Sequence, residues 1–523
     1  MSYDEAYKGL DALAIRNFGD RPVFLSWNGG REALVAYLVA FSQLFFGYSS
    51  LSVRMVSAVM GCLTLFLFFL LVRRWFSERL AIISTFLLAV SKWHLIHSRY
   101  GSRASEVTVF EVGVLYALLR GFSSPKRSTW WFLLGGILGA LGFYSYASYR
   151  VFPLVILAFL LQAPVRRALM NHRKSLIAAG LVFLAILAPL GVYLFTHPET
   201  FKYRMEVASV WSRWSETRGE TGTQKILEST GKTLGLFTLQ GDIVAGDNVY
   251  AEPMLAPLAA PFFLLGFVIL LLNIRKTPML VLLIYFVVTL LPSIFSSGAP
   301  NAYRTLGCLA PTFLIIGFGI IAAIEIIPDY ARVTRTAVLV MILGANMLLG
   351  LYDSFVRYPD ILDNLPVDVS EAWGLEAPPS DVANALNHLG SQCVAFVSPR
   401  FFFHTALEYL TYGQSKFQLM IPGTRLENEV QNDDIAVVMF ERENSNLWWL
   451  SDEEGLDLFK WWRQAHRLQE SEILSAVEKS YGSKTTKVSD RWIIGFLKKH
   501  YPGGTYLNFD RFSIYIVKLS RSN

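Results

Sequence analysis

Residues 51–74 read LSVRMVSAVMGCLTLFLFFLLVRR, an apolar run that closes on two arginines. The apolar part, residues 51–72, is long enough to cross a hydrocarbon core about 30 Å thick as a helix. Arginines directly after such a helix, here Arg73 and Arg74, are retained on the cytoplasmic side of a membrane. The stretch therefore predicts a transmembrane helix with a defined direction.

Nine more apolar runs follow the first, so the sequence predicts ten crossings. They span residues 79–95, 104–121, 129–147, 150–163, 174–195, 255–273, 277–296, 304–326 and 334–351. The 523 residues are 53% hydrophobic and only 17% charged, whereas soluble domains have about 25% charged residues. The mean hydropathy is +0.39. We expect an α-helical polytopic membrane bundle.

Basic residues in alternate loops predict the orientation of the bundle. Short loops rich in Lys and Arg stay in the cytoplasm. The basic residues are Arg73, Arg74 and Arg79; Arg120, Lys126 and Arg127; Arg166, Arg167, Arg173 and Lys174; Arg275 and Lys276; and Arg332 and Arg335. We predict a multi-pass protein of the plasma (inner) membrane. The net charge of +6 follows from these loops and gives no reason to expect a nucleic-acid partner.

By parity, three regions are predicted to be extracytoplasmic. They are residues 1–50, the long segment 196–254, and everything after about 352. We expect 1–50 to be a first outer loop with helices at 7–18 and 32–46, the second lying along the membrane surface. These fifty residues have to be exported, and no signal peptide or helix stands ahead of them in the sequence. We therefore expect that one transmembrane helix ahead of Met1 is missing. The alternative is that the first crossing itself translocates the segment.

The predicted domains are therefore the first outer loop at 1–50, the transmembrane bundle at 51–352, and a small α/β domain at 353–523. In the last domain, period-two and helical patterns predict strands and helices. The strands are 394–398, 417–421, 435–440 and 512–519, and the helices are 382–389, 453–465 and 470–481. We assign this domain no chemistry, because it has neither a Gly-rich phosphate loop nor a Cys/His cluster.

An acidic pair at the start of the chain, Asp4 and Glu5, offers a catalytic carboxylate at the outer mouth of the bundle. The alternative is that the pair only caps a helix. Further along, Glu106 and Glu111 are ionisable groups in or near an apolar helix, where they face an interior or a partner.

Several arginines stand on the predicted outer side, where the topological bias disfavours them: Arg99, Arg103, Arg150 and Arg304. Guanidinium forms paired hydrogen bonds with phosphate oxygens, so these side chains suit a lipid phosphate. The alternative is that they reach lipid headgroups.

Five short motifs, taken in order, resemble one family of membrane enzymes. They are Tyr3-Asp4-Glu5-Ala6-Tyr7, Asn28-Gly29-Gly30-Arg31-Glu32, Ser98-Arg99-Tyr100, Gly142-Phe143-Tyr144-Ser145-Tyr146 and Ala299-Pro300-Asn301-Ala302-Tyr303-Arg304. With the helix Leu51 to Arg74, they are similar to the family of protein O-mannosyltransferases and lipid A aminoarabinose transferases, over roughly residues 1–350.

The resemblance implies a C-type glycosyltransferase fold and a sugar donor carried on polyprenyl phosphate. It implies that Asp4 is the general base, with Glu5 beside it, and that the acceptor is a hydroxyl of a protein, lipid or cell-envelope glycan. Arg31 and Arg304 would bind the phosphate, and Arg99, Arg103 and Glu106 the substrate. No metal or other cofactor is required, since cations already hold the leaving group; the alternative is that the Asp4-Glu5 pair recruits a divalent metal ion.

One departure from the family pattern concerns the second outer loop, where many members carry an Asp a few residues after Ser-Arg-Tyr. This sequence has Gly101-Ser102-Arg103-Ala104-Ser105 instead, so any role of a second acid is in doubt. Two other classes stay open: a transporter or lipid flippase lined by Glu111 and the outer arginines, and a non-catalytic scaffold. Replacing Asp4 discriminates between them, because only the enzyme depends on that carboxylate.

Overall fold

The structure is a computed structural model that describes the greater part of the chain. The described residues are 2–26, 30–199, 208–211, 222–244, 246–363, 378–389, 393–397, 405–412, 417–419, 435–441, 505–508 and 512–518. The chain divides into two compact units. The first comprises Met1–Asp20, Val39–Val53 and Leu365–Asn523, and the second Arg21–Leu38 and Arg54–Asn364. The units cut across the predicted ranges 1–50, 51–352 and 353–523.

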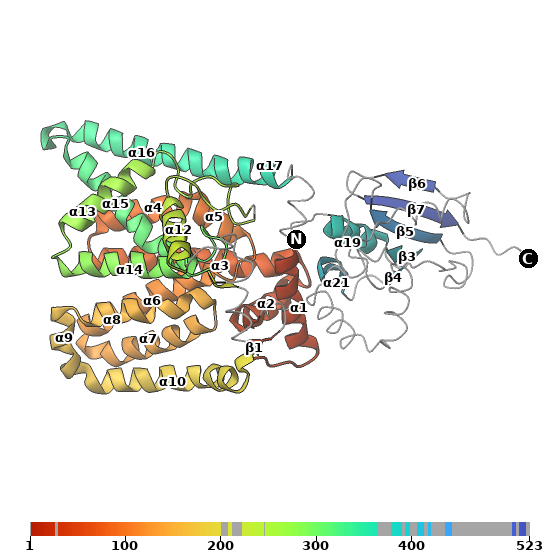
Figure 1. Cartoon of the computed structure of the whole chain (residues 1–523), viewed down its shortest axis with the longest axis horizontal. Helices are drawn as coiled ribbons and strands as arrows, with labels where there is room; N and C mark the ends of the chain where they lie inside the picture. The colour runs from red at the N-terminus through yellow and green to blue at the C-terminus, as the bar shows by residue number, and fades with distance from the viewer. Residues whose placement is uncertain are drawn as a thin grey trace, which may run out of the picture. The chain divides into compact units, whose positions relative to one another are not determined.

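Helices that run side by side dominate the second unit (Figure 1). Every predicted crossing coincides with a helix or a helix pair. The helices are α3 (Ser50–Trp75), which enters from the first unit, α4 (Glu78–Val90), α5 (Lys92–Arg99), α6 (Ser105–Ser123), α7 (Ser128–Phe143), α8 (Pro153–Leu160), α9 (Ala163–Leu169), α10 (Arg173–Thr196), α12 (Gly222–Gly235), α13 (Ala260–Leu272), α14 (Thr277–Ile294), α15 (Leu309–Glu325), α16 (Arg332–Tyr352) and α17 (Tyr358–Asp363). A short hairpin, β1 (Phe24–Leu25) with β2 (Arg31–Glu32), precedes α2 (Leu34–Phe46).

Length and apolarity identify a multi-pass membrane protein. Among the described residues, five helical stretches are long and apolar enough to cross a membrane, and a sixth follows if α4 and α5, bent by 57°, form one span. Four of the predicted crossings, in α6, α7, α8 and α13, coincide with helices outside that set. The bend falls at Ser91, whose side chain accepts a hydrogen bond from the backbone N–H of His94 and so begins α5 as a separate helix.

Two glycines bring the backbones of α13 and α15 into direct contact. A Cβ built on Gly266 would lie 1.9 Å from the carbonyl oxygen of Ile315, and one on Gly319 would lie 1.9 Å from that of Phe262. Small residues allow this approach between membrane helices, where packing replaces the hydrophobic effect as the main source of association. The α13–α15 pair therefore forms a rigid part of the bundle.

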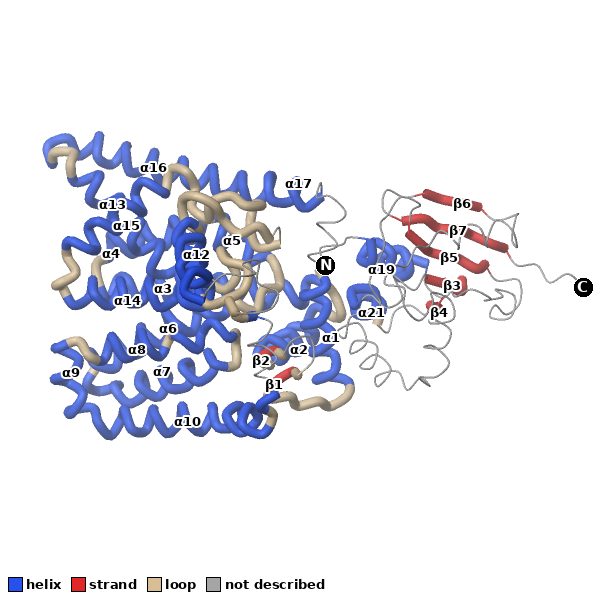
Figure 2. Tube along the Cα trace, viewed as in Figure 1, coloured by secondary structure: helices blue, strands red, loops and turns tan. Residues whose placement is uncertain are grey.

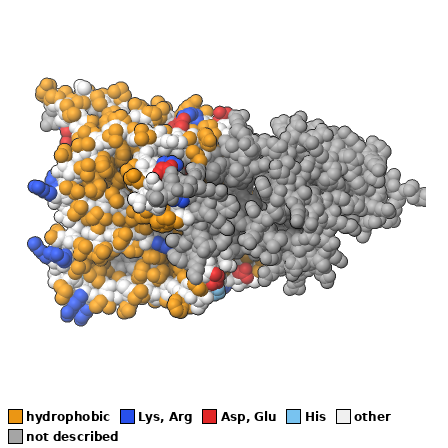
Figure 3. All heavy atoms as spheres, viewed as in Figure 1, with side chains coloured by type: hydrophobic (Ala, Val, Ile, Leu, Met, Phe, Trp, Pro, Cys, Tyr) orange, Lys and Arg blue, Asp and Glu red, His pale blue; other side chains and the backbone are white. Residues whose placement is uncertain are grey.

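Lys and Arg side chains gather at the end of the second unit where α9 lies (Figures 1 and 3). The alternation of helix direction explains this, since α3, α6 and α13 end where α4, α7 and α14 begin. The basic loops that predict the orientation thus lie at one end of the bundle. That this end faces the cytoplasm stays a prediction.

The first unit begins with α1 (Tyr3–Asn17), which starts earlier than predicted. A capping box causes the early start: the Ser2 side chain accepts from the Glu5 N–H at 3.2 Å, and the Glu5 carboxylate accepts from the Ser2 N–H at 2.9 Å. Asp4 and Glu5 consequently lie in the first turn, rather than before the helix as predicted. The helix is buried from Glu5 to Ile15.

The first unit also contains a mixed five-stranded sheet, in the order β4-β3-β5-β7-β6 (Figure 2). Its strands are β3 (Cys393–Val397), β4 (Phe417–Leu419), β5 (Ile435–Glu441), β6 (Thr505–Asn508) and β7 (Phe512–Lys518), and its helices are α19 (Pro378–Leu389) and α21 (Thr405–Thr411). β3 pairs in parallel with β4 and β5, and β7 is antiparallel to β5 and β6.

The predicted α/β character is thus confirmed. All four predicted strands are present, and α19 contains the predicted helix 382–389. β6 and α21 were not predicted. The predicted helices 453–465 and 470–481, like Asn28 and Gly29 of the Gly-rich turn, lie outside the described residues.

Candidate functional site

Polar side chains of the second unit concentrate in loops at the helix ends opposite the basic loops. These loops are residues 99–105, 143–151, 236–259 and 295–308, next to the ends of α6, α7, α13, α14 and α15. Hydrogen bonds join three of them: the Arg103 backbone N–H donates to the Tyr303 hydroxyl at 3.0 Å, and the Ala302 backbone N–H donates to the Asp242 carboxylate at 2.7 Å. The predicted outer loops therefore form one polar layer.

A cation surrounded by aromatic rings lies in this layer. The guanidinium carbon of Arg103 is 5.6 Å from the ring centroid of Tyr146, and the Arg103 backbone N–H donates to the Tyr303 hydroxyl at 3.0 Å. Tyr146 and Tyr303 meet edge to face at 5.1 Å, and His97 packs on Tyr303 in the same manner at 5.8 Å. The half-buried Arg103 guanidinium thus places a positive charge beside two tyrosine rings.

Arg304, from the adjacent turn, is held in a fixed orientation. Its Nη1 donates to the carbonyls of Ser297 at 3.1 Å and Ala208 at 3.4 Å, and its backbone N–H donates to the Asn301 side chain at 2.8 Å. Arg304 also interacts electrostatically with Asp242. The side chain is half-buried and is supported by two loops.

Asp242 braces the turn that carries Arg304. One carboxylate oxygen accepts from the Ala302 N–H at 2.7 Å and the other from the Val244 N–H at 2.9 Å. Burial raises the pKa of Asp242 to about 6, although these hydrogen bonds and the charge of Arg304 act in the opposite direction. The neighbouring Asn248 amide donates to the carbonyls of Asp242 and Glu252 and closes the same loop.

The raised pKa of Asp242 predicts a pH dependence of stability. The pKa of Asp242 in the folded protein, about 6, exceeds the model-peptide value of 3.8. Protonation of Asp242 therefore stabilises the folded state at low pH, and this stabilisation is lost as the pH rises through 6. The unfolding temperature of Asp242→Asn, relative to the unsubstituted protein, is expected to rise between pH 5 and pH 7. Thermal unfolding in detergent at both pH values measures it.

Glu252→Gln is the matched control, because the pKa of Glu252 is shifted the other way. Partial burial pulls this pKa up, but hydrogen bonds from Arg357 and the charge of Lys92 hold it below its ordinary value. The contribution of the Glu252 carboxylate to stability is therefore lost only as the pH falls below the ordinary carboxylate range. A change between pH 5 and pH 7 as large in Glu252→Gln as in Asp242→Asn would contradict the assignment.

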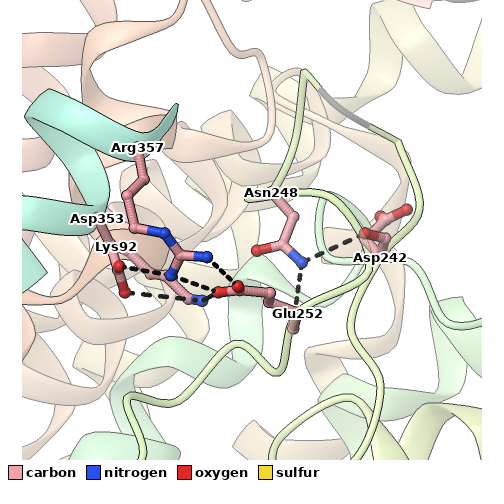
Figure 4. A network of polar contacts seen from close by, with 6 residues as sticks. All are labelled: Lys92, Asp242, Asn248, Glu252, Asp353 and Arg357. Atoms are coloured by element: carbon pink, nitrogen blue, oxygen red, sulfur yellow. Dashed lines mark hydrogen bonds and ion pairs between the residues drawn. The ribbon is translucent and has the colours of Figure 1, made fainter. Parts of the chain in front are cut away.

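An ion-pair network ties the 241–259 loop to α5 and to the end of α16 (Figure 4). Lys92 Nζ lies 3.3 Å from Glu252 Oε2 and 3.9 Å from Asp353 Oδ2. Arg357 donates to both carboxylates, at 3.1 Å from Nη1 to each. Two cations and two anions thus balance, and the Lys92 side chain is only 4% exposed. Asp353 and Arg357 belong to the π-helical segment Asp353–Arg357, which places them on one face.

The acidic pair of the first unit separates into two roles. The Glu5 carboxylate is buried and forms the capping box, as the alternative interpretation of the pair expected. Asp4 is exposed in the first turn of α1. Asp4 is therefore the carboxylate of this pair that is accessible to a substrate.

The predicted substrate-binding residues of the second unit have different environments. Arg103 and Arg304 lie in adjoining turns, as described above. Arg31, in β2, and Glu106, in the first turn of α6, are both buried. Arg99 donates to the Ser354 carbonyl at 2.8 Å and stacks 4.2 Å from the Phe355 centroid, a contact that fastens α5 to the π-helical segment.

Glu111 has a structural explanation inside the bundle. It accepts a hydrogen bond from the Tyr285 hydroxyl at 2.9 Å, and a Cβ on Gly307 would lie 2.6 Å from Oε1. Arg150, the fourth outer arginine, donates to the buried Glu32 at 2.9 Å. The first contact joins α6 to α14 and the second joins Arg150 to β2, and they account for both residues without a ligand.

Lys92, Glu252, Asp353 and Arg357 were not singled out from the sequence. Tyr146 and Tyr303 stand in two of the family motifs, but no role was predicted for either ring. Lys92 could have been recognised from the sequence, because a lysine inside a predicted membrane crossing is energetically costly without a partner. The other partners are distant in sequence. Among the described residues, no three His, Cys, Asp or Glu side chains are grouped so as to hold a metal ion.

Comparison with solved structures identifies the fold. The fold matches that of ArnT from Cupriavidus metallidurans, both bound to undecaprenyl phosphate and in the apo state, with a TM-score of 0.54 and 12% sequence identity in each case. The match covers 86% of this chain and 92% of the lipid-bound ArnT, or 91% of the apo form. The chain therefore has the fold of the C-type membrane glycosyltransferases, as predicted.

The sequence itself matches a family model in its first half. Residues 32–193 match the model described as dolichyl-phosphate-mannose-protein mannosyltransferase, which confirms the resemblance inferred from the motifs. The oligosaccharyltransferase of Archaeoglobus fulgidus is also similar, with a TM-score of 0.45 and 14% identity over 84% of this chain and 64% of that one. No curated protein matches the sequence.

Proposed function

We propose that the protein transfers a sugar, a mannose-like hexose or a pentose, from a polyprenyl-phosphate donor to a hydroxyl acceptor. The observation that carries this proposal is the polar layer of Arg103, Tyr146, Tyr303 and Arg304 in a chain whose residues 32–193 match a mannosyltransferase family model. The ArnT structure that matches this fold was solved with undecaprenyl phosphate. A lipid monophosphate has the charge that the arginines suit.

In the proposed reaction, Asp4 accepts the proton of the acceptor hydroxyl as its oxygen attacks the anomeric carbon of the sugar. The bond from that carbon to the phosphate oxygen breaks, and the polyprenyl phosphate leaves with the electron pair. Arg31 and Arg304 stabilise the charge that develops on the phosphate, and Arg103 adds a third cation. A single displacement inverts the anomeric configuration. The cations already balance the leaving group, so we propose no metal-dependent step.

The fixed orientation of Arg304 favours this role. Its Nη1 is occupied by two backbone carbonyls, and Asp242 holds the turn that carries it. A donor that needs no reorganisation when charge develops stabilises a transition state better than a freely rotating one. We also propose that this end of the bundle faces outward from the plasma membrane, since the basic loops lie at the other end.

Lipid analysis tests the proposed donor. Polyprenyl-phosphate sugars are extracted from cells that contain the gene, from a deletion strain and from an Asp4→Asn strain, and are compared by mass spectrometry. One such lipid is expected to accumulate in both defective strains, because its consumer is missing. Unchanged lipids in the deletion strain would count against a major transferase role.

A further inference from the structure

The hydroxyl of Tyr409, in α21, is a hydrogen-bonding centre of the first unit. Tyr409 is fully buried, and its hydroxyl donates to the Ser49 carbonyl at 3.2 Å. It accepts from Gln43 Nε2 at 3.2 Å and lies 2.7 Å from Ser52 Oγ. A phenol can both donate and accept hydrogen bonds, so one hydroxyl can contact all three groups. The turn between α2 and α3 is thereby fastened to α21.

The ring of Tyr409 packs directly on α1. A Cβ built on Gly9 would lie 2.5 Å from the ring, so only glycine permits this contact. Gln43 strengthens it, because the same Nε2 group that binds the Tyr409 hydroxyl also donates to the Gly9 carbonyl at 3.0 Å. One amide thus bridges α1 and α21.

A second contact holds the far end of α1. The Asn17 and Tyr48 side chains exchange hydrogen bonds of 2.9 and 3.1 Å. Tyr48 in turn meets the ring of Tyr412 edge to face at 5.2 Å, and that of Tyr409 at 6.5 Å. α1 is therefore attached at two points, separated by about two turns of helix.

α21 is itself fixed within the C-terminal α/β domain. Asn387, in α19, donates to the Leu410 carbonyl at 2.9 Å, and Ala406 and Leu407 are fully buried. Cores of this kind transmit displacement because they are close-packed. A shift of α21 would consequently move the segment that it touches.

We propose that the C-terminal α/β domain positions the helix that carries Asp4, with Tyr409 as the positioning residue. Asp4 precedes Gly9 by five residues, which is about 7.5 Å along the helix axis. The inference rests on the proposed function in taking Asp4 as the base. It gives the domain, to which the sequence assigned no chemistry, a part in placing the carboxylate.

Hydrogen exchange of α1 in the full-length protein tests the attachment. In Tyr409→Ala, amide exchange across residues 3–17 is expected to rise at least tenfold, while exchange in α13 and α15 is unchanged. Tyr409→Phe keeps the ring and loses the hydroxyl, so a smaller rise is expected. Tyr330→Ala is the matched control, since Tyr330 is 92% exposed in the second unit. Unchanged exchange of α1 in Tyr409→Ala would overturn the proposal.

Transfer kinetics test the effect on the carboxylate. A misplaced base lowers kcat, so Tyr409→Ala is expected to lose at least tenfold in kcat with a smaller change in KM for the donor. Gly9→Ala should reproduce the loss, and shortening the opposing side chain in Gly9→Ala/Tyr409→Leu should restore part of it. Faster exchange of α1 with an unchanged kcat would refute the positioning role.

Asp4→Asn separates this inference from the proposed function. A folded, fully active Asp4→Asn protein would remove Asp4 as the base, and with it the catalytic part of the inference. The exchange of α1 in Tyr409→Ala would still decide whether the C-terminal domain holds that helix. The two failures are therefore distinguishable.

Discussion

Asp4→Asn is expected to lower the rate of sugar transfer by about 10²–10⁴-fold and to leave the protein folded. The carboxylate is exposed in the first turn of α1, and the asparagine amide has nearly the same shape but does not accept the proton. The helix should persist, because the Ser2–Glu5 capping box is untouched. Consumption of a radiolabelled polyprenyl-phosphate sugar by membranes measures the rate, and circular dichroism of the purified protein measures the helix content.

Glu5→Gln is the matched control for this experiment. Glutamine also serves in a capping box, so α1 should keep its start while one negative charge is removed. We expect a change of less than tenfold, because the Glu5 carboxylate is buried and bonded to Ser2. Losses of equal size in both variants would show that charge near the start of α1 matters, and not a base at Asp4.

Lys92→Met is expected to destabilise the protein by about 2–4 kcal/mol. Removing one partner of a buried ion pair costs about 3–5 kcal/mol, and the lower range applies because the Glu252 side chain is 34% exposed. Methionine keeps the length of the side chain but leaves Glu252 and Asp353 with Arg357 as their remaining cation in this network. Denaturant or thermal unfolding in detergent gives the loss.

The surface pair Lys232 and Glu228 supplies the comparison for Lys92→Met. Its atoms are 2.8 Å apart, closer than those of Lys92 and Glu252, but the side chains are 40% and 37% exposed. Lys232→Met should cost about 0–1 kcal/mol, since exposed pairs contribute little. If both lysine variants lose the same stability, burial is not what makes the Lys92 network important.

Local pattern was sufficient for the helices and strands but not for the polar layer. The predicted crossings depend on apolar length alone, and the strands on alternation, so α3, α10, α14 and β5 could be located from neighbouring residues. The start of α1 was missed, although Ser2-Tyr3-Asp4-Glu5 has the S-x-x-E pattern of a capping box.

The contacts that build the site join residues far apart in the chain. Asp242 binds the Ala302 N–H, and Arg357 binds Glu252, across 60 and 105 residues. No periodicity within one segment encodes such partners, because each depends on the packing of several helices. The sequence did indicate Arg103 and Arg304, as basic residues on the predicted outer side, but not their contacts with the tyrosine rings and the Asp242 carboxylate.

The first unit is built from segments that lie far apart in the chain, which determines the order in which it can assemble. The Tyr409 hydroxyl that binds Gln43 lies 366 residues after it in the chain, so α1 is synthesised long before its partner in α21. A nascent chain can thus place its apolar helices in the membrane long before α1 has its full set of partners. The proposed positioning of α1 by Tyr409 therefore becomes possible only after α21 has been synthesised.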